Sequence, residues 1–366
     1  MAGRSRSQDA GPDIARLRLR NQRIDGATRG EAADVVKWLV AVQAQDFAGA
    51  KWSLGLRLRQ ATDSQIERAF NEGAILRTHL LRPTWHFVTP ADIGWLLALT
   101  APRVHAASAH MVRSLELDAA VFKRSNAALA KALQGGQHLT RSELEEVLQK
   151  VGIATDVGNR MAYLMMGAEL DGVICSGPRR GKQFTYALLE DRAPQAKTME
   201  RDEALAELSR RYFASRGPAT VQDFAKWSGL TAADAGRGLE VVQHGLRHVV
   251  LDGQAYWHPK SRPPHNDGSP TAHLLSNYDE YISSYKDRSA ILSEEHGALL
   301  WGRGNALAYV IVVDGLIVGT WKRALMRDSV VIETNPFRRL THAEKGAITE
   351  AAQRYGRFQD LPVSLL

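Results

Sequence analysis

The fold can be predicted from the stretch Ile75-Leu76-Arg77-Thr78-His79-Leu80-Leu81-Arg82-Pro83-Thr84-Trp85-His86-Phe87-Val88. It contains two short segments rich in β-branched and aromatic residues, and Arg82-Pro83-Thr84 forms the turn between them. Apolar residues recur at helical spacing before it, from Thr28 to Ala44, from Lys51 to Leu58 and from Asp63 to Phe70. The expected order is helix, helix, helix, hairpin, which is the plan of a winged-helix unit.

The same order returns twice along the chain. In the second copy, Thr140 to Glu143 spells a capping box that opens a helix, and a Met-rich helix then leads into a hairpin with a basic tip. In the third copy, Asp252-Gly253 separates two strands and is a strong hairpin signal. Helices arranged in this helix-turn-helix order often enter a DNA groove, and they also serve as spacers or protein contacts. Both interpretations of each copy remain open.

A change of character follows the polar segment Ser261 to Pro270. Strands are expected at Tyr309 to Val313, Leu316 to Trp321 and Ser329 to Glu333, and a helix from about Thr341 to Tyr355 closes the unit. We therefore predict an α+β protein with tandem winged-helix domains and a C-terminal β-rich domain. The predicted divisions are a disordered tail at 1–12, winged-helix domains at 13–117, 118–196 and 197–262, and the β-rich domain at 263–366.

The composition narrows the functional classes. The 366 residues carry 47 Lys and Arg against 40 Asp and Glu, a formal charge of +7, which suits a polyanionic partner without requiring one. Cys175 is the single cysteine, so an internal disulfide and a cysteine-based zinc site are both excluded. The sequence has neither the apolar core of a signal peptide nor a run of about eighteen apolar residues. We expect a cytoplasmic, nucleoid-associated protein that makes no membrane contact.

Two amides stand out in Val42-Gln43-Ala44-Gln45-Asp46-Phe47. In an extended segment, Gln43 and Gln45 point to one face. Each offers donors and an acceptor but cannot ionise near neutral pH. Together they can hold a water or a sugar oxygen, which suits a reaction with a good leaving group. The alternative is a polar loop that caps a helix.

Other polar residues allow both structural and functional interpretations. His79 and His86 lack the acidic neighbours of a metal site and are expected to be hydrogen-bonding residues of the fold. Asp279-Glu280 can supply a general base, although two exposed acids in a loop are commoner. Trp321 beside Lys322 and Arg323 suits a nucleic-acid backbone, but a core tryptophan beside solvated charges is slightly favoured. No phosphate-cradling glycine motif and no serine triad are visible.

Several of these motifs together resemble the AlkZ/YcaQ family of bacterial DNA glycosylases. They are Gln43-Ala44-Gln45-Asp46, Leu76-Arg77-Thr78-His79, Arg82-Pro83-Thr84-Trp85-His86, Leu274-Leu275-Ser276-Asn277-Tyr278-Asp279 and Val318-Gly319-Thr320-Trp321-Lys322. The resemblance covers nearly the whole chain. It implies tandem winged-helix units and a β-rich domain gathered around duplex DNA, and a catalytic motif of two glutamines that Gln43-Ala44-Gln45 matches.

The resemblance also implies an activity. Members with two glutamines remove bulky N7-alkylpurines and unhook interstrand crosslinks, often as self-resistance to DNA-alkylating antibiotics. Because alkylation at N7 gives the purine a positive charge, Gln43 and Gln45 need only orient water and sugar. We expect a monomeric, monofunctional N-glycosylase without metal or other cofactor. The alternative is a noncatalytic winged-helix DNA-binding protein or regulator. Candidates for DNA contact are Arg82, Thr84, His86, Arg179, Arg180, Lys182, Lys322 and Arg323.

Overall fold

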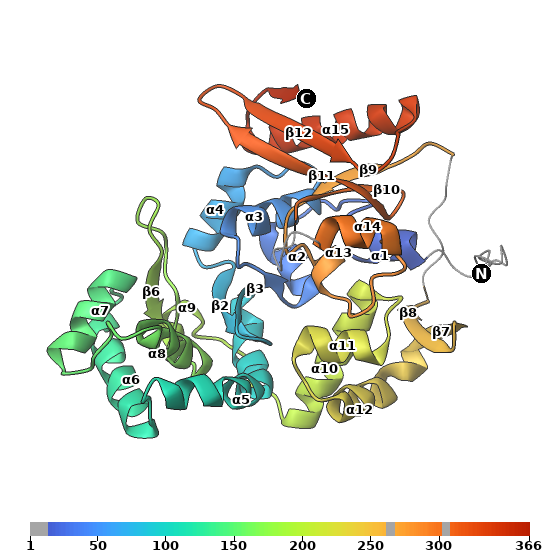
Figure 1. Ribbon diagram of the computed structural model, residues 1–366. Coiled ribbons are helices and arrows are strands. Elements are labelled where there is room, and N and C mark those ends of the chain that lie inside the picture. Colours follow the sequence, from blue (N-terminus) through green and yellow to red (C-terminus); the bar gives the residue numbers. More distant parts are fainter. Residues whose placement is uncertain (1–13, 261–267, 302–307) are drawn as a thin grey trace.

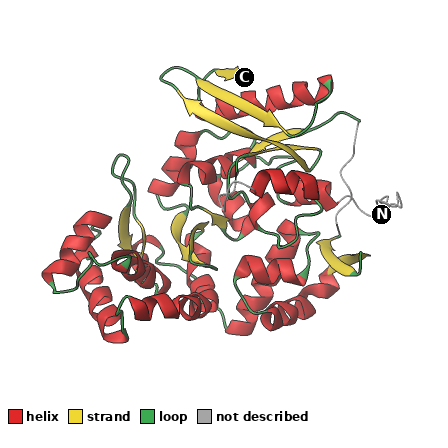
Figure 2. Ribbon diagram, in the orientation of Figure 1, coloured by secondary structure: helices red, strands yellow, loops and turns green. Residues whose placement is uncertain are grey.

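A computed structural model describes residues 14–260, 268–301 and 308–366. The C-terminal sheet lies at the top of Figure 1 above the N-terminal helices, and two mostly helical lobes lie below, on either side of strands β2 and β3. Runs of helices are followed by runs of strands (Figure 2), and among the described strands every pair except β12 and β13 is antiparallel, so the predicted α+β class is confirmed. The predicted tail at 1–12 and Gly302-Arg303-Gly304 lie outside the described residues. Within the described ranges, no helix is long and apolar enough to cross a membrane.

The first repeat contains the predicted helices and hairpin, with one correction. The helix expected over residues 28–44 covers only Ala32–Leu39. It ends at Val40, whose φ of 67° and ψ of −56° form a γ-turn in which the Ala41 N–H donates to the Leu39 carbonyl at 2.8 Å. A positive φ is rare for a β-branched residue. The chain then extends through Gln43. The elements are α1 (Ile14–Asn21), α2 (Ala32–Leu39), β1 (Val42–Gln43), α3 (Phe47–Leu56), α4 (Asp63–Asn71), β2 (Leu76–Leu80) and β3 (Thr84–Val88).

The second repeat follows the long helix α5 (Pro90–Ser114) and forms the lower left lobe of Figure 1. The predicted capping box is present, because the Thr140 side chain accepts from the backbone of Glu143 and the Glu143 side chain accepts in return from the backbone of Thr140. This exchange satisfies backbone donors at the start of a helix. The elements are α6 (Ala119–Leu133), β4 (Leu139–Thr140), α7 (Arg141–Lys150), α8 (Arg160–Leu170), β5 (Ile174–Ser176) and β6 (Thr185–Leu188).

The third repeat forms the lower right lobe of Figure 1. Asp252-Gly253 makes the predicted turn, with both residues at positive φ, as a tight hairpin requires. Gly229 ends α11 in the left-handed conformation. α9 (Leu189–Arg192) directly follows β6 and packs against the second repeat. The elements of the third repeat are α10 (Arg201–Arg216), α11 (Val221–Ser228), α12 (Ala232–Val242), the 3-10 turn η1 (Gln243–Gly245), β7 (Leu246–Leu251) and β8 (Gln254–Pro259).

The three repeats share one strand arrangement. In the first two, the strand orders are β1-β3-β2 and β4-β6-β5, so a short early strand pairs with the second strand of the hairpin. In the third, an antiparallel bridge between Ala219 and Trp257 of β8 occupies the corresponding place. The repeats differ in the residues that connect this early strand to the next helix. Thr140, the last residue of β4, and Thr220, just after the bridge, cap that helix directly, whereas Ala44 and Gln45 separate β1 from the cap residue Asp46.

The C-terminal unit is a five-stranded sheet with order β13-β12-β11-β10-β9. Its core is continuous with that of the first repeat, since apolar side chains of α2, α3 and α4 pack in one cluster with those of β9 to β12 and α15. A second core joins β2, β3 and α5 to the third repeat, and a third lies within the second repeat. The elements are β9 (Ala272–Leu275), α13 (Glu280–Ser283), α14 (Glu294–Trp301), β10 (Val310–Val313), β11 (Leu316–Leu325), β12 (Val330–Pro336), α15 (His342–Gln359) and β13 (Val363–Leu365).

Candidate active site

The two glutamines lie on the extended segment that runs along β3. Gln43 is opposite His86 in the strand register, and the Ala44 N–H donates to the Trp85 carbonyl at 2.7 Å. Ala44 is fully buried, and its carbonyl accepts from Arg77 Nε at 3.0 Å. The Gln43 side chain is largely buried, with the residue 8% exposed, whereas Gln45 is exposed. The predicted extended conformation is therefore present through Ala44, whereas Gln45 lies in a bend.

The amide of Gln43 has a defined orientation. Its Oε1 accepts from Arg82 Nη2 at 3.3 Å, and Arg82 Nη1 donates to the Lys226 carbonyl at 3.4 Å. Arg82 thus connects the turn between β2 and β3 with α11 of the third repeat. Because the oxygen of Gln43 faces Arg82, the Nε2 donors are presented on the other side of the amide.

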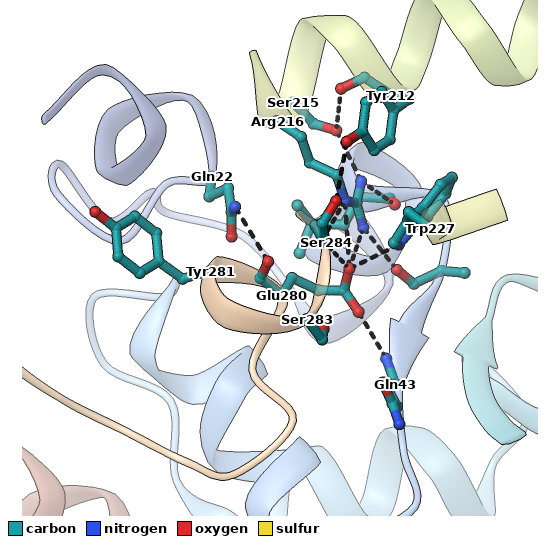
Figure 3. A network of polar contacts seen from close by, with 12 residues as sticks. Gln22, Gln43, Tyr212, Ser215, Arg216, Trp227, Glu280, Tyr281, Ser283 and Ser284 are labelled. Carbon is teal, nitrogen blue, oxygen red and sulfur yellow. Dashed lines mark hydrogen bonds and ion pairs between the residues drawn. The ribbon is translucent and has the colours of Figure 1, made fainter. Parts of the chain in front are cut away.

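A buried carboxylate holds the main chain at Gln43 (Figure 3). The Gln43 N–H donates to Glu280 Oε1 at 2.9 Å, and Glu280 Oε2 accepts from Arg216 Nη2 at 2.7 Å. Burial by itself raises the pKa of Glu280, but the charge of Arg216 and the hydrogen bonds it receives lower that pKa to about 2. Glu280 is therefore ionised at neutral pH. The same Oε2 also accepts from Trp227 Nε1 at 2.9 Å and from Ser284 Oγ at 2.7 Å.

The arginine of this pair also binds the chain before the motif. Arg216 Nη1 donates to the Leu39 carbonyl at 2.8 Å, and Nη2 donates to the Ala41 carbonyl at 3.0 Å. Between them is Val40, whose positive φ costs about 1–3 kcal/mol in a residue of this kind. Such a conformation persists only where the surrounding contacts impose it.

The residue after Gln45 is held from the C-terminal sheet. Asp46 Oδ1 accepts from the Gly49 N–H at 3.1 Å, which caps α3, and Asp46 Oδ2 accepts from the Tyr309 hydroxyl at 2.6 Å. Arg323 donates to Tyr309 at 3.1 Å and to Tyr355 at 2.6 Å. Arg323, predicted to contact phosphate, therefore has its guanidinium occupied by two tyrosines. Gln45 has one long hydrogen bond, from the Trp85 N–H at 3.5 Å.

Polar groups line the sheet face beside Gln43. His86 lies directly opposite both Gln43 and Thr78, so the three side chains share one face. His86 is fully buried, and burial lowers its pKa to about 3, so it is neutral. Its Nδ1 donates to the Thr84 carbonyl at 2.9 Å. Among the described residues, His86 Nε2, Thr78 Oγ1 and Thr84 Oγ1 have no hydrogen-bond partner. A fully buried His86 does not reach a phosphate in this conformation.

The expectation that both histidines are satisfied by the fold is met only in part. His79 bonds through Nδ1 to the Glu169 carboxylate and packs against the Trp85 ring at 4.4 Å. For His86, one ring nitrogen is satisfied and the other is not. Within the residues that the structure describes, no group of three or more His, Cys, Asp or Glu side chains is placed to hold a metal.

The basic hairpin of the second repeat is divided between anchored and exposed cations. Arg179 donates to Glu67 at 2.9 Å and lies over the Phe47 and Phe184 rings, so it fixes the hairpin to the first repeat. Arg180 is exposed but pairs with Glu143 at 2.7 Å. Lys182 at the tip is exposed, as is Lys322 on β11. The adjacent Trp321 is 2% exposed and belongs to the core, which confirms the favoured interpretation of that residue.

The expectation of two exposed acids at Asp279-Glu280 is wrong. Both are buried, and each pairs with a buried arginine. Asp279 binds Arg57 through both oxygens at 2.8 and 2.9 Å, at a separation of 222 residues. Glu280 and Arg216 are the site residues that the sequence does not reveal, because 64 residues separate them and neither belongs to a recognisable motif. The only available signal is two acids in an otherwise uncharged segment.

Comparison with known proteins assigns the family. The sequence model of the AlkZ-like DNA glycosylases matches residues 36–358, and the chain belongs to this family. An interstrand DNA cross-link repair glycosylase from Streptomyces sahachiroi is 27% identical over 327 residues, which cover 83% of this chain and 85% of the relative. The solved structure of Streptomyces sahachiroi DNA glycosylase AlkZ has the same fold, with a TM-score of 0.79 at 23% identity over 97% of this chain and 98% of that chain. The family resemblance noted in the sequence is confirmed.

Proposed function

We propose that this DNA glycosylase hydrolyses the N-glycosidic bond of bulky N7-alkylated purines in duplex DNA, including those of interstrand crosslinks. Its role would be DNA repair or self-resistance to a DNA-alkylating antibiotic. The name of the Streptomyces sahachiroi relative supports a crosslink as substrate. The chemistry of the candidate site supports a base that is already cationic in the DNA and leaves as a neutral purine.

The proposal rests on the presence of two uncharged amide side chains, one in β1 and one just after it. The groups available there are the amides of Gln43 and Gln45, which do not ionise. The nearest buried carboxylate, Glu280, accepts four side-chain hydrogen bonds from three residues and one main-chain bond, so it is not free to act as a base. A site of this kind does little for a neutral purine, but it is adequate for a purine that already carries a positive charge.

The reaction then proceeds with a simple balance of atoms. The bond between C1′ of the sugar and N9 of the purine breaks, and its electron pair neutralises the cationic base. A water oxygen bonds to C1′ and releases a proton to solvent. Gln43 and Gln45 position the water and the sugar and stabilise the developing oxocarbenium charge through their dipoles. Because the reaction is hydrolytic and monofunctional, the DNA strand stays intact at the abasic site.

The fold suggests how the duplex is held. We infer that the three repeats are winged-helix units, with the divisions expected from the sequence, because each has a hairpin whose second strand pairs with an earlier short segment. Lys182 on the second wing and Lys322 on β11 are exposed and suit phosphate contact. Arg179 and Arg323 are held by neighbouring side chains and serve the protein fold instead.

The test is release of base from a duplex that carries a defined N7-alkylguanine. The purified protein is incubated with this duplex, and strand breaks are measured with and without subsequent alkali. The proposal predicts breaks after alkali only, with the free alkylated base in solution. Tight binding without base release would favour the noncatalytic DNA-binding alternative. Breaks without alkali would show that the enzyme also cleaves the strand, and Lys226, whose pKa burial lowers to about 8, would then be the amine to examine.

A further inference from the structure

We propose that Glu280 and Arg216 form a positioning clamp for the glutamine motif, an inference that rests on the proposed function. The pair is completely buried, and Glu280 Oε1 with Arg216 Nη1 and Nη2 bind the main chain on both sides of Val42. It acts through the backbone of Gln43 and does not touch the substrate. In Figure 3 the Glu280 carboxylate lies above Gln43, and the Gln43 side chain extends downward, away from it.

The two side chains of the clamp form hydrogen bonds with the main chain of alternate residues in one segment. Arg216 binds the carbonyls of Leu39 and Ala41, and Glu280 binds the N–H of Gln43. Ala41 and Gln43 are alternate residues of the extended part of the segment, and their main-chain groups face the same side. The ion pair there stands where a neighbouring strand would otherwise supply partners, and at Leu39 it binds the last residue of α2. On its other side the segment pairs with β3. The extended path to Gln43 is therefore fixed from both sides.

Val40 explains why such a device is needed. Its φ of 67° and ψ of −56° form a tight γ-turn from α2 into β1, closed by a hydrogen bond from the Ala41 N–H to the Leu39 carbonyl, and such a turn is rare and strained. The carbonyls that Arg216 binds are those of its two neighbours. If the clamp is weakened, the segment can relax at Val40, and Gln43 moves with it. Displacement of a reacting group by about 1 Å can slow an enzyme by about a hundredfold.

Glu280→Gln is the informative substitution because an amide cannot replace this carboxylate. Three side chains donate to Oε2, and the Gln43 N–H donates to Oε1. A glutamine has one acceptor end and one donor end. Its oxygen would turn toward the three donors, and its NH₂ group would then face the Gln43 N–H. The variant keeps the shape of the residue but loses the contact with the motif.

The chain offers a matched control in the adjacent residue. Asp279 is equally buried and pairs with the buried Arg57, but its contacts are to Ser53, Arg57 and the Tyr281 N–H. None of these belongs to residues 39–45. Asp279→Asn therefore removes one charge from a comparable ion pair without releasing the motif. Both variants should have lowered melting temperatures, and only Glu280→Gln should place Gln43 wrongly.

The experiment compares single-turnover release of N7-alkylguanine at a temperature well below both melting transitions. We expect Glu280→Gln to be slower than wild type by about tenfold or more, with the Kd for the adduct duplex within about twofold, and Asp279→Asn to stay within about threefold of wild type. Amide hydrogen exchange across residues 39–45 should accelerate only in Glu280→Gln. Equal rates for the two variants would overturn the inference. Wild-type protein that releases no base would instead overturn the proposed function.

A milder variant covers the case in which Glu280→Gln does not fold. Arg216→Lys keeps the charge beside Glu280, but one ammonium cannot reproduce the planar fork that binds Glu280 and two carbonyls. We expect release to slow by about fivefold and the exchange of residues 39–43 to accelerate. Wild-type release together with wild-type exchange in this variant would contradict the clamp.

Discussion

Gln43 and Gln45 lie two residues apart, Gln43 in β1 and Gln45 in the bend that follows it, and their surroundings differ. Gln43 is 8% exposed, with its amide oriented by Arg82 and its main chain held by Glu280. Gln45 is exposed, and its side chain has one long hydrogen bond to the Trp85 N–H. The Gln43 amide is therefore fixed before DNA binds, whereas the Gln45 amide is free to adjust to the DNA.

This asymmetry assigns different tasks to the two residues. A fixed amide loses no conformational entropy when the substrate binds, so its hydrogen bonds act fully in the transition state. A mobile amide must first be ordered, and solvent can take over part of its role. We therefore expect Gln43 to contribute more to the rate of base release than Gln45.

The largest effect should come from Gln43→Ala. We expect single-turnover release to fall by about a hundredfold for Gln43→Ala and by about tenfold for Gln45→Ala, because water can replace an exposed amide but not a buried, oriented one. DNA binding and the melting temperature should stay near those of wild type. Equal losses for the two variants would show that the difference in burial has no bearing on catalysis.

Arg82→Met tests what orients Gln43. The substitution keeps the apolar stem but removes the donor to Gln43 Oε1. If Arg82 orients the amide, release should slow by about tenfold while the Kd for DNA changes by less than about threefold. If Arg82 is a phosphate contact, as the sequence suggested, the Kd should rise and the salt dependence of binding should weaken. The two readouts separate these roles.

A smaller effect is expected at the tip of the second hairpin. Lys182→Ala should weaken DNA binding by about twofold to fivefold and lower the slope of log K against log salt by about 1, since one phosphate contact is lost. Arg179→Ala, in the anchored part of the hairpin, should mainly lower the melting temperature because Arg179 pairs with Glu67. An unchanged salt slope for Lys182→Ala would remove that residue from the interface.

The smallest effect on activity concerns pH. Gln43 and Gln45 do not ionise, and Glu280 has its pKa lowered to about 2, so release should vary by less than about twofold from about pH 6 to pH 9. A bell-shaped profile in this range would indicate a titrating acid or base and would contradict catalysis by amides.

Stability, in contrast, should depend on pH. Burial lowers the pKa values of His86 and His273 from 6.5 to about 3, so the unfolded state binds protons that the folded state does not. Stability is therefore lost as pH falls below 6.5. Each histidine should reduce the free energy of unfolding by about 2 kcal/mol between pH 7 and pH 5. Urea unfolding at pH 7 and pH 5 measures this drop in the free energy of unfolding. In His86→Asn the drop should be smaller by the contribution of one histidine.

Local sequence signals predicted much of the fold. The hairpin β2–β3, the capping box at Thr140 and the Asp252-Gly253 turn are each specified by neighbouring residues, and each is present. The length of the helix before the motif was wrong because nothing in the apolar run marks Val40 as its end. Arg216, which lies far along the chain, binds the carbonyls on either side of Val40.

Of the candidate site, the sequence predicted the two glutamines but not the residues that hold them in place. The pattern Gln43-Ala44-Gln45 indicates two amides on one face, but no pattern indicates what holds them. Glu280 was expected to be exposed, since an acid in a loop usually is, and only the tertiary fold supplies its buried arginine. Similarly, the sequence does not distinguish Arg323 from Lys322 as a candidate for phosphate contact. Only the tertiary fold brings the hydroxyls of Tyr309 and Tyr355 to the Arg323 guanidinium.

The double variant Gln43→Ala/Gln45→Ala tests most directly whether two uncharged side chains catalyse the hydrolysis. Single-turnover release of N7-alkylguanine is measured at DNA concentrations that saturate both variant and wild-type protein. We expect the double variant to release the base at below about one hundredth of the wild-type rate, with a Kd for the adduct duplex within about twofold of the wild-type value. Release by the double variant at the wild-type rate would contradict catalysis by these side chains.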